Sequence, residues 1–226
     1  MTRSSRGHVA AAFALLAAVV AAPAGAGSRT ATVCHVVIAN HRVCPFANLI
    51  GANLAGIQAD RANLTGARLN RAKLTHAHLE HAKLDRANLT GAVLIRARLK
   101  AATLTGANLT AAVMTGVHLD DANLRSARMS SARLGGASIT GAKLNGAVLA
   151  QANLAGADLG DADMTGADMT GANLTHANLS SAHLERANLT GANLTGAVLT
   201  QTHLHGAIFH GTICPDGTTT DTFCSA

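Results

Sequence analysis

The chain has 226 residues, a formal net charge of +6 at neutral pH, and neither Trp nor Tyr. A basic chain does not reproduce the field of the DNA phosphate backbone, so the charge argues against a protein that acts as a DNA mimic. The four cysteines include no C-x-x-C pair, which argues against thiol redox catalysis.

The first segment, residues 1–26, has the pattern of a secretory signal peptide. Arg3 and Arg6 precede an apolar run over residues 9–22, and residues 24–26 match the small-x-small cleavage pattern. The apolar run is too short to act as a membrane anchor. We therefore expect cleavage near Ala26 and a secreted or otherwise extracytoplasmic protein without a membrane span.

From Phe46 to Gly211 the sequence repeats every five residues. There are 33 consecutive repeats without an insertion; 26 of them are centred on Leu, and Ala lies two residues before the centre in 30. A period of five builds no apolar stripe on a helix, because a helix needs a period near 3.6 and a coiled coil one of 3.5. We therefore reject a helical structure and interpret the segment as one continuous repeat structure.

Each repeat has two inward positions, two outward positions and a fifth position. In an extended chain, the Ala and the central Leu point to the same side, and the residues flanking the centre, such as Asn63 and Thr65, point outward. The fifth position must reset this alternation, so we expect a corner there. Gly occupies it 16 times and tolerates the positive φ of tight turns, although residues such as Arg61 also occur there. The pattern predicts a solenoid whose neighbouring coils satisfy one another's backbone groups.

The repeats, which read A-N-L-T-G at residues 62–66, closely resemble those of the pentapeptide-repeat family. The resemblance implies an all-β fold, a right-handed quadrilateral parallel β-helix with four repeats per coil and with the Ala and central side chains inside. At four repeats per coil, 33 repeats make about eight coils, and a spacing of about 4.8 Å gives a tube about 40 Å long. Phe46, Phe209 and Phe223 lie at or beyond the ends of the array, where rings can cover the last layers.

The cysteines form two pairs that flank the array, Cys34 with Cys44 and Cys214 with Cys224. Pairing across the array would join the ends of a tube about 40 Å long, whereas bonded cysteines have Cα atoms within about 7 Å. We expect two local disulfides, and a metal site is the alternative for the same cysteines. The predicted domains are a signal peptide (1–26), an N-terminal cap with a disulfide hairpin (27–45), the β-helix (46–211) and a C-terminal cap loop with a disulfide (212–226).

Basic and acidic residues separate along the array. Nine basic residues lie between Arg61 and Lys100, whereas residues 158–185 contain five acids and neither Lys nor Arg. Four repeats per coil would distribute the nine basic residues over all sides as a girdle, so we expect no specific nucleic-acid binding. A solvated surface explains these charges, and attraction to an anionic envelope polymer is the functional alternative.

One group of outward residues suits metal chemistry. With four repeats per coil, residues twenty apart are neighbours, so His183 lies beside His203 and Glu185 beside His205. Three imidazoles and a carboxylate suit zinc or another divalent transition metal. The chain has 12 His, so ordinary surface histidines are the alternative interpretation. We expect no other cofactor.

Catalysis is not expected, because it needs a concave, partly dry site and a filled prism has flat sides. Ladders of Thr, such as Thr170 with Thr190, suggest ice binding, but Thr also suits β structure without a ligand. The best-known activity of the family that the repeats resemble, DNA mimicry at a topoisomerase, fits poorly with a basic chain and a leader peptide.

We therefore predict a non-enzymatic, secreted solenoid, a monomer or dimer, that serves as a rigid structural or protein-interaction module. The partner would be an unknown protein or an anionic envelope polymer. A surface metal-binding protein that uses the His and Glu residues is the alternative.

Overall fold

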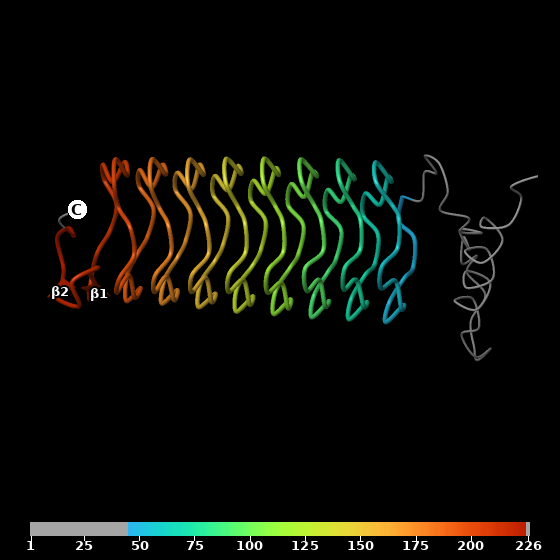
Figure 1. Ribbon diagram of the computed structural model, residues 1–226, viewed down its shortest axis with the longest axis horizontal. Helices are drawn as coiled ribbons and strands as arrows, with labels where there is room; N and C mark the ends of the chain where they lie inside the picture. The colour runs from blue at the N-terminus through green and yellow to red at the C-terminus, as the bar shows by residue number, and fades with distance from the viewer. Residues whose placement is uncertain (1–44, 225–226) are drawn as a thin grey trace, which may run out of the picture.

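The structure, a computed structural model, describes residues 45–224. The predicted signal peptide, residues 27–44 of the predicted N-terminal cap and the Cys34–Cys44 pair lie outside the described residues. The described chain winds into a long stack of similar coils that runs from residue 45 to the C-terminal cap (Figure 1). In this part of the chain no helix has the length and apolar character needed to cross a membrane.

Successive coils are joined by parallel β-bridges between residues twenty apart. Four ladders begin at residues 48, 53, 58 and 63, with the bridges Asn48↔Arg68, Asn53↔Lys73, Gln58↔His78 and Asn63↔Lys83. Since twenty residues are four pentapeptides, bridged residues hold the same position of the repeat in adjacent coils. The predicted neighbour relation between residues twenty apart is confirmed.

Each coil uses its backbone to hold the coils on both sides. The amide of Leu69 donates to the carbonyl of Asn88 at 2.7 Å, toward the following coil, and the amide of Arg68 donates to the carbonyl of Ala47 at 2.8 Å, toward the preceding one. The same two bonds recur along the array. Neighbouring coils therefore satisfy one another's backbone groups, as the repeat pattern predicts.

The inward positions form one apolar column. From Ala67 to Leu194, every Ala, Val, Leu, Met or Ile at an inward position is at most 1% exposed. Phe209 closes the column at 3% exposure, but Phe46 and Phe223 are 75% and 66% exposed. The expectation that all three rings cover the ends of the array is therefore wrong for Phe46 and Phe223, which lie outside the column.

The fifth position of every repeat is a corner with positive φ. Sixteen of these corners are Gly, and the 18 non-Gly residues with positive φ, from Phe46 to Gln201, all occupy the same position. Just before the centre, an Asn or Asp often accepts from the amide two residues later, as in Asn63 with Thr65 at 3.1 Å. The Thr hydroxyl adds a second bond in many repeats, such as Thr190 to Asn188 at 2.6 Å. The A-N-L-T-G pattern thus has a local structural reason at each polar position.

The array ends in a short antiparallel hairpin. Strand β1 (Thr212–Ile213) pairs with β2 (Thr219–Thr220), with Thr212 opposite Thr220 and Ile213 opposite Thr219. The hairpin lies at the C-terminal end of the stack (Figure 1). The boundary of the predicted cap at residue 212 stays a prediction.

Candidate metal site

Three of the four predicted metal-site residues come together on one side of the solenoid. His183 and His203 are bridge partners in adjacent coils, and their rings stack with centroids 4.5 Å apart and an interplanar angle of 7°. Glu185 lies two residues after His183 in the same coil. One ligand atom from each of these three residues lies within 4.8 Å of the other two.

Both imidazoles turn their Nδ1 atoms toward the same carboxylate oxygen. Glu185 Oε1 lies 3.2 Å from His183 Nδ1 and 4.0 Å from His203 Nδ1. The side chains of His183 and His203 are 47% and 56% exposed, whereas that of Glu185 is 29% exposed. The group is therefore open to solvent on the imidazole side and partly covered at the carboxylate.

The carboxylate of Glu185 is held as an anion. Burial raises its pKa, but hydrogen bonds from its own backbone and from His183, together with the charges of His183 and His203, lower the pKa by more, and the net shift is downward. Its second oxygen, Oε2, is buried and has no hydrogen-bond partner among the described residues. A negatively charged oxygen without a partner marks a place where a cation would be favoured.

His205, the fourth predicted ligand, does not join the group. His205 is exposed and lies in the coil after the one that contains Glu185. Its ring nitrogens do not belong to the group of ligand atoms that lie within 4.8 Å of one another. The spacing of twenty placed it beside Glu185 along the ladder, but the carboxylate turns toward His183 and His203 instead.

Asp163 is the neighbour that the sequence interpretation missed. It is the bridge partner of His183 in the preceding coil, where its Oδ1 accepts from the amide and hydroxyl of Thr165 at 3.1 and 2.8 Å. Burial raises the pKa of Asp163, and hydrogen bonds from Asn145 and Thr165 with the charge of His183 lower it by more. The same spacing of twenty that paired His183 with His203 would have identified it.

Comparison with known proteins supports the repeat interpretation. The family model for pentapeptide repeats matches the chain in eight copies. The matched residues are 46–80, 72–110, 102–141, 132–171, 142–180 and 172–211. The chain belongs to the pentapeptide-repeat family. This confirms the resemblance in the sequence and supports a right-handed β-helix solenoid. No curated protein matches the chain significantly.

Several solved pentapeptide-repeat structures are similar to this chain. HetL, a pentapeptide repeat protein involved in heterocyst differentiation regulation from the cyanobacterium Nostoc sp. strain PCC 7120, is 33% identical, with 80% of this chain and 89% of that chain covered and a TM-score of 0.43. A pentapeptide repeat protein from the Arabidopsis thaliana thylakoid lumen is 35% identical over 40% of this chain and 63% of that chain, with a TM-score of 0.39. A trypsin-treated form of QnrB1, a plasmid-mediated fluoroquinolone resistance protein, is 22% identical over 57% and 66%, with a TM-score of 0.45.

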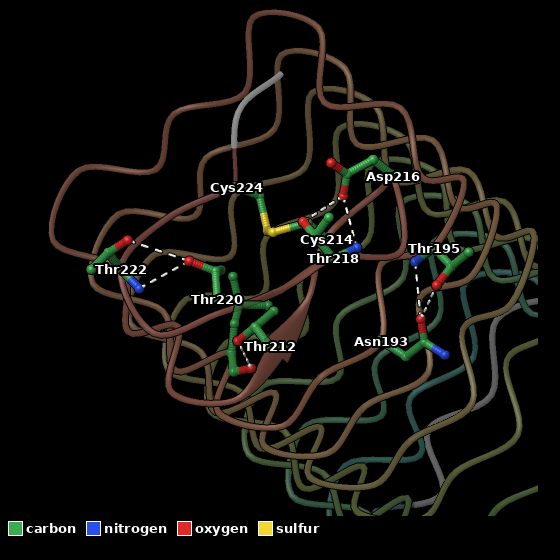
Figure 2. The surroundings of a disulfide bond; sticks show 10 residues. Asn193, Thr195, Thr212, Cys214, Asp216, Thr218, Thr220, Thr222 and Cys224 are labelled. Atoms are coloured by element: carbon green, nitrogen blue, oxygen red, sulfur yellow. Dashed lines mark hydrogen bonds between the residues drawn. A yellow bond between two sulfur atoms is a disulfide. The ribbon is translucent and has the colours of Figure 1, made fainter.

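The C-terminal cap of this pentapeptide-repeat protein is closed by a disulfide. Cys214 and Cys224 are bonded, with their Cα atoms 5.3 Å apart and both residues buried (Figure 2). Between them, the amide of Gly217 donates to the carbonyl of Cys214 at 2.9 Å and closes a tight turn. Asp216 Oδ1 accepts from the amide and hydroxyl of Thr218 at 2.9 and 2.7 Å (Figure 2). The predicted local pairing at this end agrees with the structure.

The basic residues of the N-terminal coils surround the pentapeptide solenoid. Arg68, Lys73, Lys83 and Arg98 belong to four different ladders of bridges. Arg98 pairs with Glu80 at 2.6 Å, and Lys100 lies 4.0 Å from Asp121. The positive charge therefore forms the predicted girdle and does not line one groove.

Proposed function

We propose that this pentapeptide-repeat protein is a non-enzymatic, secreted, rigid interaction module. The observation that carries the proposal is the filled interior: the inward positions from Ala67 to Leu194 are buried apolar side chains that belong to one hydrophobic cluster. We take the rod to be quadrilateral with about eight coils, since 33 repeats are shared among four ladders of bridges. Specificity then belongs to the outward positions and the caps.

The cap supports an extracytoplasmic location. Disulfides persist in oxidising compartments and are rare in the cytosol, and the Cys214–Cys224 bond is local and buried. We propose that the leader over residues 1–26 directs export, with cleavage near Ala26.

The girdle of basic residues is the part of the rod that we assign to an anionic partner. It includes Arg68 and Lys73 on neighbouring sides, and among the described residues neither forms an ion pair. Unpaired surface cations attract a polyanion at long range, and salt weakens that attraction. An envelope protein or polymer with an acidic surface fits this chemistry.

A binding experiment tests the proposal. The full chain would be immobilised and exposed to an extracytoplasmic envelope fraction over a series of salt concentrations, and each retained component would be identified and measured again in purified form. We expect one component to bind at low salt and to be released by salt. A variant with Arg68→Glu and Lys73→Glu should bind at least about tenfold more weakly, because two attractive charges become repulsive.

The matched control is Lys143→Glu, which reverses a charge outside the girdle and should leave binding nearly unchanged. Retention of no component at any salt concentration would favour a passive spacer. Equal binding by the girdle variant and the parent would show that the girdle is not the docking surface.

A further inference from the structure

We propose that His183, Glu185 and His203 bind one divalent transition-metal ion, and that the ion clasps two successive coils near the C-terminal end of the rod. Two imidazole nitrogens and one carboxylate oxygen are a donor set that zinc uses in proteins, with a solvent molecule left to complete four-coordination. The site lies on a flat outer side, so a hydrated ion reaches it without passing through the core.

The donor atoms are already gathered on one side of the group. They lie within 4.8 Å of one another, and both Nδ1 atoms face Glu185 Oε1. Zinc bonds to nitrogen at about 2.0–2.1 Å, so the two nitrogens would have to approach to about 3.4 Å in a tetrahedral site. The rings stack with their centroids 4.5 Å apart, and a small inward tilt of exposed rings closes the remaining gap.

The unpaired oxygen of the Glu185 carboxylate also favours a cation at this place. Glu185 Oε2 is buried without a hydrogen-bond partner, and among the described residues no Lys or Arg forms an ion pair with Glu185. The Glu185 carboxylate is faced by the two imidazoles, whose Nδ1 atoms lie 3.2 and 4.0 Å from Oε1. A divalent ion bound at this group would neutralise the Glu185 carboxylate.

The position of the site gives the ion a structural consequence. His183 and Glu185 belong to one coil and His203 to the next, which is the last part of the array. In that part the amides of Leu199, Leu204 and Phe209 have no hydrogen-bond acceptor among the described residues. Terminal units of a solenoid lack one neighbour and open first, so a bond across these coils would hold the end that is otherwise least supported.

Zinc titration of the full chain by isothermal calorimetry tests the site, after removal of bound metal with a chelator. We expect one strong site per chain, and His203→Ala should weaken it at least about tenfold because a ligand is lost. Glu185→Gln should also weaken it, since an amide is a poor ligand for zinc. A cobalt titration that produces visible absorption bands would report coordination by nitrogen and oxygen ligands directly.

Two controls keep the test specific. His205→Ala removes an exposed imidazole two residues away and should change the affinity less than about threefold. His78→Ala removes a partly buried imidazole on another side of the rod and should likewise leave the affinity nearly unchanged. Thermal unfolding without metal shows that each variant folds. Equal zinc affinity in the parent and His203→Ala, or no strong site in the parent, would overturn the proposal, and a loss in His205→Ala as large as in His203→Ala would overturn the three-ligand assignment.

Amide exchange measures the clasp separately from the affinity. A ligand that binds only the folded form reduces opening, so saturating zinc should slow exchange over residues 199–213 and leave the coils near residue 104 unchanged. Binding without this local protection would retain the metal site but overturn its role as a clasp.

Discussion

The corner residue is the point of greatest local strain in each repeat. Eighteen non-Gly residues adopt positive φ, and each such residue costs about 1–2 kcal/mol relative to an ordinary conformation. Arg96, Ala101 and Gln151 accept this strain because the bridges on both sides fix the path of the chain. The sequence predicted a corner at every fifth position, because the alternation of side chains must be reset there, but it did not predict that the 18 non-Gly residues would adopt the same positive φ as Gly.

Adjacent glycines allow the strain to be measured directly. Gly136 is a corner with a φ of 62° and open space around an added Cβ, whereas Gly135 has no positive φ and its added Cβ would meet Ala155 O at an ordinary 3.6 Å. We expect Gly136→Ala to reduce the free energy of unfolding by about 1 kcal/mol and Gly135→Ala to be neutral or slightly stabilising. Chemical denaturation of the two variants checks this. Equal effects would contradict corner strain.

The carboxylate of Asp163 should make a pH-dependent contribution. Its pKa in the fold lies below the ordinary value of 3.8, so its ionised form stabilises the fold above that pH, and the contribution is lost as pH falls through the lowered pKa. Asp163→Asn keeps the turn to Thr165, because Asn63 makes the same bond, and removes the negative charge.

We expect this substitution to destabilise by less than about 1 kcal/mol at neutral pH, since the group is only partly covered, and to have no effect well below pH 3.8. Thermal unfolding at both pH values, with Asp161→Asn at an exposed corner as control, measures the difference. A constant difference across pH would rule out the charge as its cause.

The element of this fold is one coil with its bridges, and most of it was predictable. Inward Ala and Leu positions, outward Asn and Thr positions and neighbours twenty residues apart follow from the period and from the family resemblance, because no insertion disturbs the register. Side-chain orientation was not predictable. His203 and His205 both belong to the coil next to that of Glu185. The carboxylate faces His203 and not His205, because it turns toward the side on which His183 lies in its own coil.

The C-terminal cap should open locally when its disulfide is removed. The Cys214–Cys224 bond closes a loop with a separation of ten residues. Breaking a disulfide that closes a loop of this size lowers the free energy of unfolding by about 2–3 kcal/mol, because the unfolded chain regains conformational freedom. Asp221 also ties the cap to the array, because it accepts from the amide of Gly211 at 2.7 Å. We expect Cys214→Ser with Cys224→Ser to speed amide exchange over residues 211–224.

Coils far from the cap should keep their protection, because each coil contacts only its neighbours. The matched control is the oxidised parent under identical conditions. Unchanged exchange in the cap would show that β1, β2 and the turn hold it without the bond. Faster exchange throughout the rod would contradict the local role.

At the scale of the whole molecule, the rod is a one-dimensional stack. The buried column is continuous and the bridges connect only adjacent coils, so its stability should grow with the number of coils. Charged residues are not distributed evenly along this stack. The basic girdle lies in the N-terminal coils, and the acids of residues 158–185 lie in the C-terminal ones. The two ends therefore present different electrostatic surfaces on the same frame.

Deletion of one full coil should be tolerated. Removing residues 102–121 joins Ala101 to Ala122 and preserves both the period of five and the bridge spacing of twenty. We expect a folded, shorter rod that unfolds at a lower denaturant concentration. Removing residues 102–119 deletes 18 residues, breaks the period and should expose inward side chains. Circular dichroism, small-angle scattering and denaturation compare the two, and equal folding by both would contradict a strict register.

Because residues twenty apart are neighbours, the position of every outward side chain on the surface follows from its residue number. A side chain introduced at any outward position lies beside the residues numbered twenty lower and twenty higher, and successive sites along a ladder advance by about 4.8 Å. Outward residues can therefore change one at a time while the buried column stays constant. The same chain could acquire or lose a binding surface by drift in its polar positions without any change of fold.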